Sequence, residues 1–83
     1  SFNVWPDSGQ RNLTIQLKNY PIGKALKINL VNSQGVLVAS QEFGAPVAME
    51  VILPIPTLPM GLYYCTIYEG NAQIAMQAVA LGN

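Results

Sequence analysis

Apolar and polar residues alternate in short runs along most of this chain. In a run such as NLTIQL (residues 12–17), a period of two puts every second side chain on the same face of an extended strand. Runs of this kind, bounded by Gly, Pro, Asn or Ser, recur about every ten residues, a spacing typical of all-β domains. The predicted strands comprise residues 2–5, 12–17, 25–31, 36–43, 47–53, 62–68 and 72–81.

Residues typical of turns separate these strands. Asn32-Ser33-Gln34-Gly35 stands between two alternating runs, and Gly35 can adopt the positive φ of a tight hairpin. Residues 69–71 predict a second hairpin in the same way. The prolines between residues 54 and 60 remove backbone donors, so this segment is predicted to be a linker rather than a central strand. Further turns are predicted at residues 18–23 and 44–46.

The spacing of strands and turns predicts an all-β fold, a single immunoglobulin-like antiparallel β-sandwich of about seven strands. No segment has the apolar periodicity of a long amphipathic helix, although Ala, Gln and Met in residues 72–81 have high helix propensity. Alternation directs these side chains to the interior: Leu13, Ile15, Leu26, Ile28, Leu30, Tyr63, Cys65 and Ile67. Burial of each contributes about 1.5–3 kcal/mol, against an ordering cost of about 1–2 kcal/mol per residue, so marginal stability is expected.

The composition narrows the classes of function. The 83 residues are expected to form one domain, residues 1–83, with one modest core. Four Lys plus Arg balance four Asp plus Glu and only 10% of residues are charged, so no basic surface for nucleic acid or lipid headgroups is expected. Residues 1–17 lack the features of a signal peptide. Because the chain begins at Ser1, we expect it to be a piece of a longer or processed protein.

The residue types needed for most catalytic and metal sites are scarce. The chain has no histidine and one cysteine, and its acids, Asp7, Glu42, Glu50 and Glu69, are separated by whole strands. We therefore expect no catalytic residues, no metal, no cofactor and no small-molecule substrate. Cys65 shares a strand face with core positions, which predicts a small buried hydrophobic residue rather than a reactive thiol.

Tyr64, Thr66 and Tyr68 lie on the opposite face of the same predicted strand. Together with Trp5 they could form an aromatic platform for a sugar ring or a protein partner. The simpler interpretation, which we favour, is that amphipathic tyrosines cover the outer surface of a sheet.

Several sequence features occur in a fixed order: Trp5-Pro6-Asp7-Ser8, then NLTIQL, LKINLVNSQGVLV and MEVILPIPTLPMGLYYCTIYEG, then a last strand. In this order they resemble the C-terminal sorting domain carried by cargo of the type IX secretion system. The opening motif of that family is commonly Tyr-Pro-Asn-Pro. Here Trp5 stands for the tyrosine, Pro6 matches, Asp7 replaces the asparagine and Ser8 replaces the second proline. Pro6 fixes φ and Asp7 can cap a turn, so this motif is expected to begin the domain rather than to bind a ligand.

Two further motifs carry the resemblance. The family's central hairpin, a polar turn with Gly followed by Val-x-Val, is matched by residues 31–38, with Gly35 in the turn. The family's Leu-x-x-Gly-x-Tyr-x-Val-x-Ile strand corresponds to Leu58, Gly61, Tyr63, Cys65 and Ile67, with Cys65 at the Val position.

The resemblance implies recognition rather than catalysis. The outer-membrane translocon recognises a domain of this kind after export to the periplasm. The domain thereby directs a passenger protein to the cell surface or the medium. In typical cargo a cell-surface sortase of the same system then cleaves the domain off. The translocon and the sortase are therefore the implied partners.

The final predicted strand is the best candidate for a docking edge, because it is last in the chain and free of charge. The candidate docking residues are Ile74, Met76, Ala78, Val79 and Leu81. The same edge could also mediate self-association. An alternative function is an immunoglobulin- or fibronectin-like accessory or carbohydrate-binding module of a secreted enzyme or adhesin, binding through Trp5, Tyr64 and Tyr68.

Overall fold

The computed structural model describes residues 2–18, 23–45 and 47–82, which form seven strands and no helix. The strands are β1 (Phe2–Pro6), β2 (Asn12–Leu17), β3 (Leu26–Asn32), β4 (Leu37–Phe43), β5 (Glu50–Pro54), β6 (Gly61–Glu69) and β7 (Ala72–Leu81). All seven predicted strands are confirmed, and six of them have bounds within one residue of the prediction. Residues 19–22 and 46, which belong to two of the predicted turns, lie outside the described residues.

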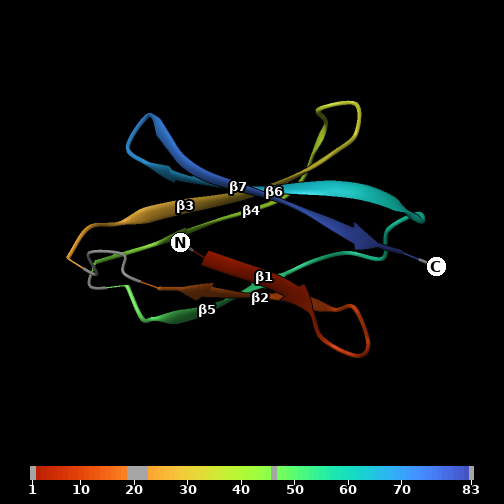
Figure 1. The fold of residues 1–83 in the computed structure, drawn as a ribbon, viewed down its shortest axis with the longest axis horizontal. Helices are drawn as coiled ribbons and strands as arrows, with labels where there is room; N and C mark the ends of the chain where they lie inside the picture. Colours follow the sequence, from red (N-terminus) through yellow and green to blue (C-terminus); the bar gives the residue numbers. More distant parts are fainter. Residues whose placement is uncertain (1, 19–22, 46, 83) are drawn as a thin grey trace.

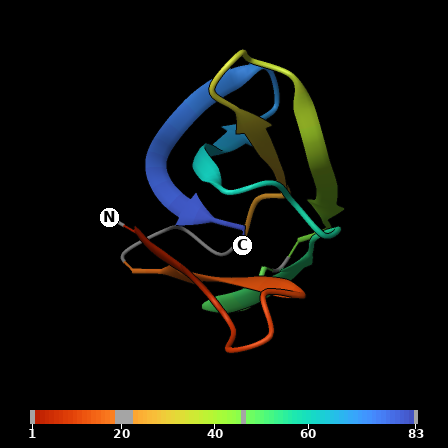
Figure 2. The same ribbon diagram turned by 90° about the vertical axis from the view of Figure 1, so that its right-hand side faces the viewer.

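The strands form two antiparallel sheets packed face to face, which confirms the predicted sandwich (Figures 1 and 2). One sheet has the order β1-β2-β5 and the other has the order β4-β3-β6-β7. In the seven-stranded immunoglobulin constant domain the fourth strand belongs to the sheet of the first two. Here β4 instead pairs with β3, because a short hairpin joins them.

The β3–β4 hairpin shows how local sequence sets this pairing. The Asn32 side chain accepts hydrogen bonds from the backbone N–H groups of Gln34 and Val36 through Oδ1, each at 2.9 Å. The Gly35 N–H donates to the Asn32 carbonyl at 2.9 Å, and Gly35 has a φ of 83°. The predicted positive φ at Gly35 is therefore confirmed. The predicted turn between β6 and β7 also forms, and Gly70 within it has a φ of 61°.

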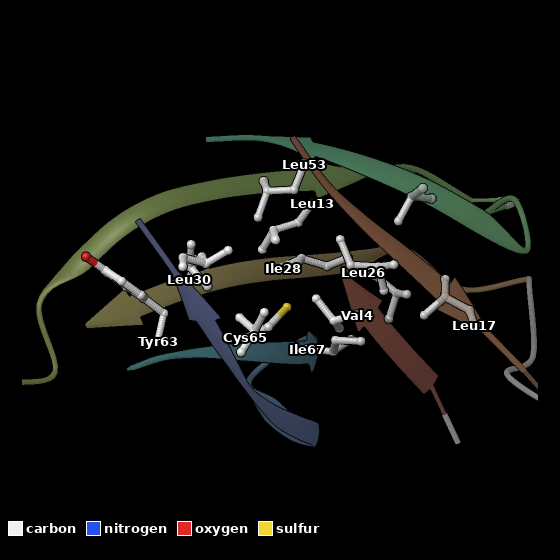
Figure 3. Packing of buried hydrophobic residues seen from close by; sticks show 14 of the residues in the cluster. Val4, Leu13, Leu17, Leu26, Ile28, Leu30, Leu53, Tyr63, Cys65 and Ile67 are labelled. Atoms are coloured by element: carbon white, nitrogen blue, oxygen red, sulfur yellow. The ribbon is translucent and has the colours of Figure 1, made fainter. Parts of the chain in front are cut away.

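The inner faces of the two sheets enclose a single apolar core (Figure 3). All eight side chains predicted to be internal are at most 4% exposed: Leu13, Ile15, Leu26, Ile28, Leu30, Tyr63, Cys65 and Ile67. Further core residues come from the strands at the sheet edges, among them Val4, Val51, Leu53, Val79 and Leu81. Because the period of a strand is two, their neighbours along each strand face outward.

The start of β5 differs from the prediction. The strand begins at Glu50 rather than at residue 47, although Val47 is buried in the core. The Leu17 N–H donates to the Met49 carbonyl at 2.7 Å, but regular pairing with β2 begins only at Glu50 opposite Gln16. Val47 therefore continues the apolar alternation that predicted a longer strand, because its side chain is buried. Its backbone does not take part in the regular pairing between β5 and β2. Among the described residues there is no helix of the length and hydrophobicity needed to cross a membrane.

Candidate functional site

The described residues contain no group of three or more His, Cys, Asp or Glu side chains placed to hold a metal ion. Lys24 and Glu69 form an ion pair across 3.3 Å at the surface. The features that distinguish this molecule are instead the turn after β1, the connection from β5 to β6, and the open edge formed by β7.

The turn from β1 to β2 is organised by Asp7. One carboxylate oxygen accepts a hydrogen bond from the Arg11 N–H at 2.9 Å, and the other accepts from the Asn12 side-chain amide at 3.1 Å. These bonds hold the pKa of the Asp7 carboxyl below its usual value of 3.8. The bond from the Asn12 side chain has the larger effect, and the bond from the Arg11 N–H has the next largest. The Asp7 N–H also donates a hydrogen bond to the Asn12 carbonyl at 3.1 Å. The predicted capping role of Asp7 is thus confirmed, and Trp5 and Pro6 belong to the strand that leads into this turn.

The connection from β5 to β6 ends in a buried tyrosine. The Tyr63 ring is 4% exposed, and its hydroxyl donates to the Pro59 carbonyl at 2.7 Å. Figure 3 shows the ring at one end of the core, with its hydroxyl directed away from the other labelled side chains. A tyrosine that bonds back to the backbone just before its own strand is a feature of immunoglobulin-like sandwiches known as the tyrosine corner. Tyr63 therefore fixes the path of the connection as well as filling the core.

The end of the chain packs against this same connection. Gly82 has a φ of 88°, and a Cβ placed on it would lie 2.3 Å from the Pro59 carbonyl oxygen. The Gly82 N–H donates to the Gln10 side chain at 2.7 Å. Gln10 itself has a φ of 52°, which is uncommon for a residue other than glycine. We call Gln10, Pro59, Tyr63 and Gly82 the C-terminal corner, and a cavity of about 80 Å³ adjoins it.

The C-terminal corner joins segments that are far apart in sequence at one end of the sandwich. Figure 1 shows the β1–β2 turn, the β5–β6 connection and the end of β7 at the same end of the molecule. The Ile55 N–H donates to the Arg11 carbonyl at 2.9 Å, which ties the connection to the turn. Two of the motifs quoted above, the opening Trp5-Pro6-Asp7 and the strand that contains Tyr63, therefore lie together.

The remaining motif positions have separate locations. Gly35 lies in the β3–β4 hairpin, and Ile67 is a core residue of β6 with 1% exposure. A Cβ on Gly61 would meet the Tyr63 ring at 3.9 Å, an ordinary contact, so nothing in the structure explains a glycine there.

The strand β7 forms an edge of the four-stranded sheet, as its place in the sequence led us to expect. Of the candidate docking residues, Ile74 and Met76 are 44% and 57% exposed and Ala78 is also exposed. Val79 and Leu81 have buried side chains, so they can offer only backbone groups to a partner. The Gln77 side chain donates to the Val4 carbonyl at 3.1 Å and links β7 to β1 of the other sheet.

The aromatic residues do not form one platform. Trp5 follows the buried Val4 in β1, so it faces outward from the three-stranded sheet and is 41% exposed. Tyr64 and Tyr68 pair with Val31 and Lys27 on the outer face of the four-stranded sheet. The two outer faces point in opposite directions, so no single ligand can lie on all three rings.

Cys65 is fully buried, as predicted. Burial raises the pKa of its thiol to about 12. In antibody domains the second cysteine of the inter-sheet disulfide follows the corner tyrosine by two residues, and Cys65 has this position relative to Tyr63. Here the residue is a free thiol in an apolar environment.

The corner contacts were missed by reasoning from the sequence. The contact of Tyr63 could have been predicted, because a buried tyrosine needs a hydrogen-bond partner for its hydroxyl. The carbonyl groups of the preceding turn are the nearest acceptors. No local signal existed for the bond between Gln10 and Gly82, which are separated by 72 residues.

Comparison with known proteins identifies the sequence pattern. The family model for the secretion system C-terminal sorting domain matches residues 3–80 of the chain. A search of curated proteins found no match.

Proposed function

This chain belongs to the family of secretion system C-terminal sorting domains, and we propose that the outer-membrane translocon docks on its β7 edge. Domains of this family are the sorting signals of type IX secretion cargo, which is exported to the cell surface or the extracellular medium. The family is one of sorting domains and is not a catalytic family. On this proposal residues 1–83 act as one unit, and a cell-surface sortase of the system acts on the cargo after the translocon.

The observation that carries the proposal is the contrast between β7 and the other edge strands. Natural edge strands are often protected from pairing by charges, prolines or covering groups. Among the described residues, β4 carries Glu42, while β5 carries both Glu50 and Pro54. The strand β1 ends at Pro6, and its Val4 carbonyl is occupied by Gln77.

The strand β7 lacks the charges and prolines of the other edges, and its protection is limited to a β-bulge at Ile74 and the side-chain bond from Gln77 to β1. Its ten residues include no charge and no proline. A partner strand can add to such an edge through main-chain hydrogen bonds, a common mode of peptide recognition. The same property makes self-association through β7 the main side reaction that we expect.

A reporter fusion tests the function. Residues 1–83 are fused behind a reporter that carries a periplasmic export signal, in a host with the type IX system and in one without it. We expect the reporter at the cell surface or in the medium of the first host and in the periplasm of the second. Periplasmic retention in both hosts would contradict the sorting function of this chain.

Two changes to β7 then test the docking edge. Removing Gln73 to Asn83 deletes most of the strand and should abolish delivery, but it also uncovers core residues. Ile74→Lys is the milder change, because it adds a protective charge to the edge at a side chain that is already 44% exposed. The matched control is Ile52→Lys on β5, where the side chain is 46% exposed. Delivery should fall with Ile74→Lys alone; equal delivery by the two variants would exclude the β7 edge.

A further inference from the structure

Strand register gathers apolar side chains on the outer face of the four-stranded sheet. Val31 of β3 pairs with Leu37 of β4 on one side and with Tyr64 of β6 on the other, and Tyr64 pairs with Ala78 of β7. Beside this row, Leu62 of β6 pairs with Ala80 of β7. We call these residues the outer apolar row: Leu37, Val31, Tyr64, Ala78, Leu62 and Ala80.

The rest of this face becomes more polar with distance from the outer apolar row, although β7 contributes one more large apolar side chain. In the next row, Asn29 accepts a hydrogen bond from Ser40 and pairs with Thr66. Thr66 in turn pairs with Met76 of β7, which is 57% exposed. One row further, Lys27 pairs with Glu42, and its ammonium lies 5.6 Å from the centre of the Tyr68 ring. Charge on this face is thus confined to the end of the sheet opposite the C-terminal corner. A partner of the outer apolar row must itself be uncharged there.

The outer apolar row has a step beside the open edge. The outward residues of β7 next to Tyr64 and Leu62 are alanines, so the larger side chains stand above the edge strand. A hollow of about 380 Å³ lies over β3 and β6 beside the outer apolar row. Tyr64, Thr66 and Met76 line it together with polar residues such as Asn29, Asn32 and Gln73, and the alanines of the step are not part of its lining. Thr66 is only 6% exposed although it lies on the outer face, so it forms the floor. Leu62, in contrast, is 46% exposed.

We propose that the outer apolar row receives large apolar side chains from the strand with which the translocation machinery extends the sheet at β7. In an added strand, every second side chain lies on the outer face, next to Ala78 and Ala80. Large side chains at those positions would cover the alanines and contact Tyr64 and Leu62. Recognition then depends on side chains of the added strand as well as on main-chain hydrogen bonds. The step beside the alanines favours an added strand with large side chains at these positions. This inference rests on the proposed docking at β7.

A second copy of this chain fits the outer apolar row less well. If two copies paired through β7, each would present Met76, Ala78 and Ala80 on this face. Two of these three side chains are methyl groups, which would leave the step unfilled. A lipid surface is also a poor fit, because the row has no Lys or Arg to meet headgroups. The occupant is therefore a protein strand with alternating large apolar residues.

The test compares two positions with equal exposure. Leu62 and Ile52 are each 46% exposed and lie on the outer faces of opposite sheets. Leu62 is on β6, a central strand, so Leu62→Glu leaves the main chain of the β7 edge intact. In the reporter fusion, Leu62→Glu should reduce delivery about tenfold or more, because a carboxylate would be buried without a partner. Ile52→Glu should deliver like the unchanged fusion.

Thermal unfolding of both purified variants serves as the folding check. If both fold and are delivered equally, the outer apolar row is not a docking surface, although the sorting function stands. If the unchanged fusion is not delivered, the sorting function itself fails. If Leu62→Glu does not fold, Leu62→Gln replaces it, and the same comparison of delivery with Ile52→Gln decides the question.

A photoreactive amino acid at position 62 or 52 identifies the occupant in the secreting host. We expect a cross-link from position 62, and not from position 52, to a component of the secretion machinery identified by mass spectrometry. A cross-link from position 62 to a second copy of this chain or to lipid would overturn the inference. Equal cross-linking from both positions would do the same.

Discussion

The interior of the sandwich contains fifteen buried apolar side chains among the described residues, whereas the C-terminal corner depends on two hydrogen bonds and one close backbone contact. Tyr63 belongs to both regions, since its ring is in the core and its hydroxyl bonds to Pro59. The interior is built from many interchangeable contacts of the same kind. The corner is built from a few contacts, each of which requires one particular residue.

This difference indicates separate roles in stability. Loss of one core side chain should lower the stability of the whole sandwich, because both sheets share the core. Loss of a corner contact should mainly loosen the end of β7 and the β5–β6 connection, because those segments lie at one end of the sandwich, outside the shared core (Figure 1). Five predictions test this contrast.

The largest expected effect concerns access to the interior. Cys65 should resist a bulky thiol reagent in the native protein and react after unfolding, because it is buried and its pKa is raised to about 12. At neutral pH a rise from 9.0 to about 12 reduces the thiolate fraction by about a thousandfold. The unfolded thiol ionises at lower pH than the folded one, so stability should fall as pH rises above 9. Rapid native labelling, followed by mass spectrometry, would place Cys65 at the surface.

The second prediction is the cost of a cavity in the core. Leu30→Ala should lower the free energy of unfolding by about 2–5 kcal/mol, because the Leu30 side chain is fully buried between the sheets. Leu37→Ala, at a side chain that is 54% exposed, is the matched control and should change stability by less than about 0.5 kcal/mol. Denaturant unfolding measures both. Similar losses in the two variants would show that the core is not where the sandwich derives its stability.

The third prediction addresses the backbone contact in the C-terminal corner. Gly82→Ala should cost about 1–3 kcal/mol, because the new Cβ would clash with the Pro59 carbonyl and the φ of 88° is strained for alanine. Hydrogen exchange should show faster opening near the end of β7. Gly44→Ala is the control, since a Cβ there has no atom within 4 Å and no positive φ. If the two variants were equally stable, the close contact at Gly82 would have no energetic role.

The fourth prediction separates the Tyr63 ring from its hydroxyl. Tyr63→Phe keeps the ring in the core and removes the bond to Pro59, so it should cost about 0.5–1.5 kcal/mol. Tyr68→Phe removes a weaker, exposed contact of 3.4 Å with Gln73 and should cost less. The comparison uses thermal unfolding. A larger loss for Tyr68→Phe would argue against a tyrosine corner at Pro59.

The smallest effect is expected at the surface turn. The pKa of Asp7 is lowered in the folded protein, so its contribution is present at pH values above 3.8 and is lost as pH falls below that value. Asp7→Asn should therefore flatten the loss of stability on acidification while leaving the core unaffected. Unfolding midpoints between pH 2 and pH 7 would show this. An unchanged acid profile in the variant would mean that the bonds from Asn12 and Arg11 do not contribute.

The alternation of residues by itself determined the strands and the interior of this protein. A period of two places Leu13, Ile15 and similar residues on one face, whatever the partner strands are. Turn residues such as Gly35 and Gly70 act locally, so their hairpins could also be predicted. The start of β5 could not, because Val47 is buried without being part of a ladder.

The position of β7 at an edge was expected from its place in the sequence, but only the tertiary structure decided which other strands form edges, which outer faces are apolar and where Gly82 packs. The separation of Trp5 from Tyr64 and Tyr68 depends on which sheet each strand joins, and alternation carries no information about that. The outer apolar row forms because the register of four strands brings its residues side by side. Each strand alone contributes only one or two of these residues, so no single strand predicts the row. The bond from Gly82 to Gln10 forms only once both sheets have brought residues 72 positions apart to the same end of the sandwich. Local sequence fixes the conformation and the inward face of each strand, whereas the positions of distant strands follow from packing of the whole chain.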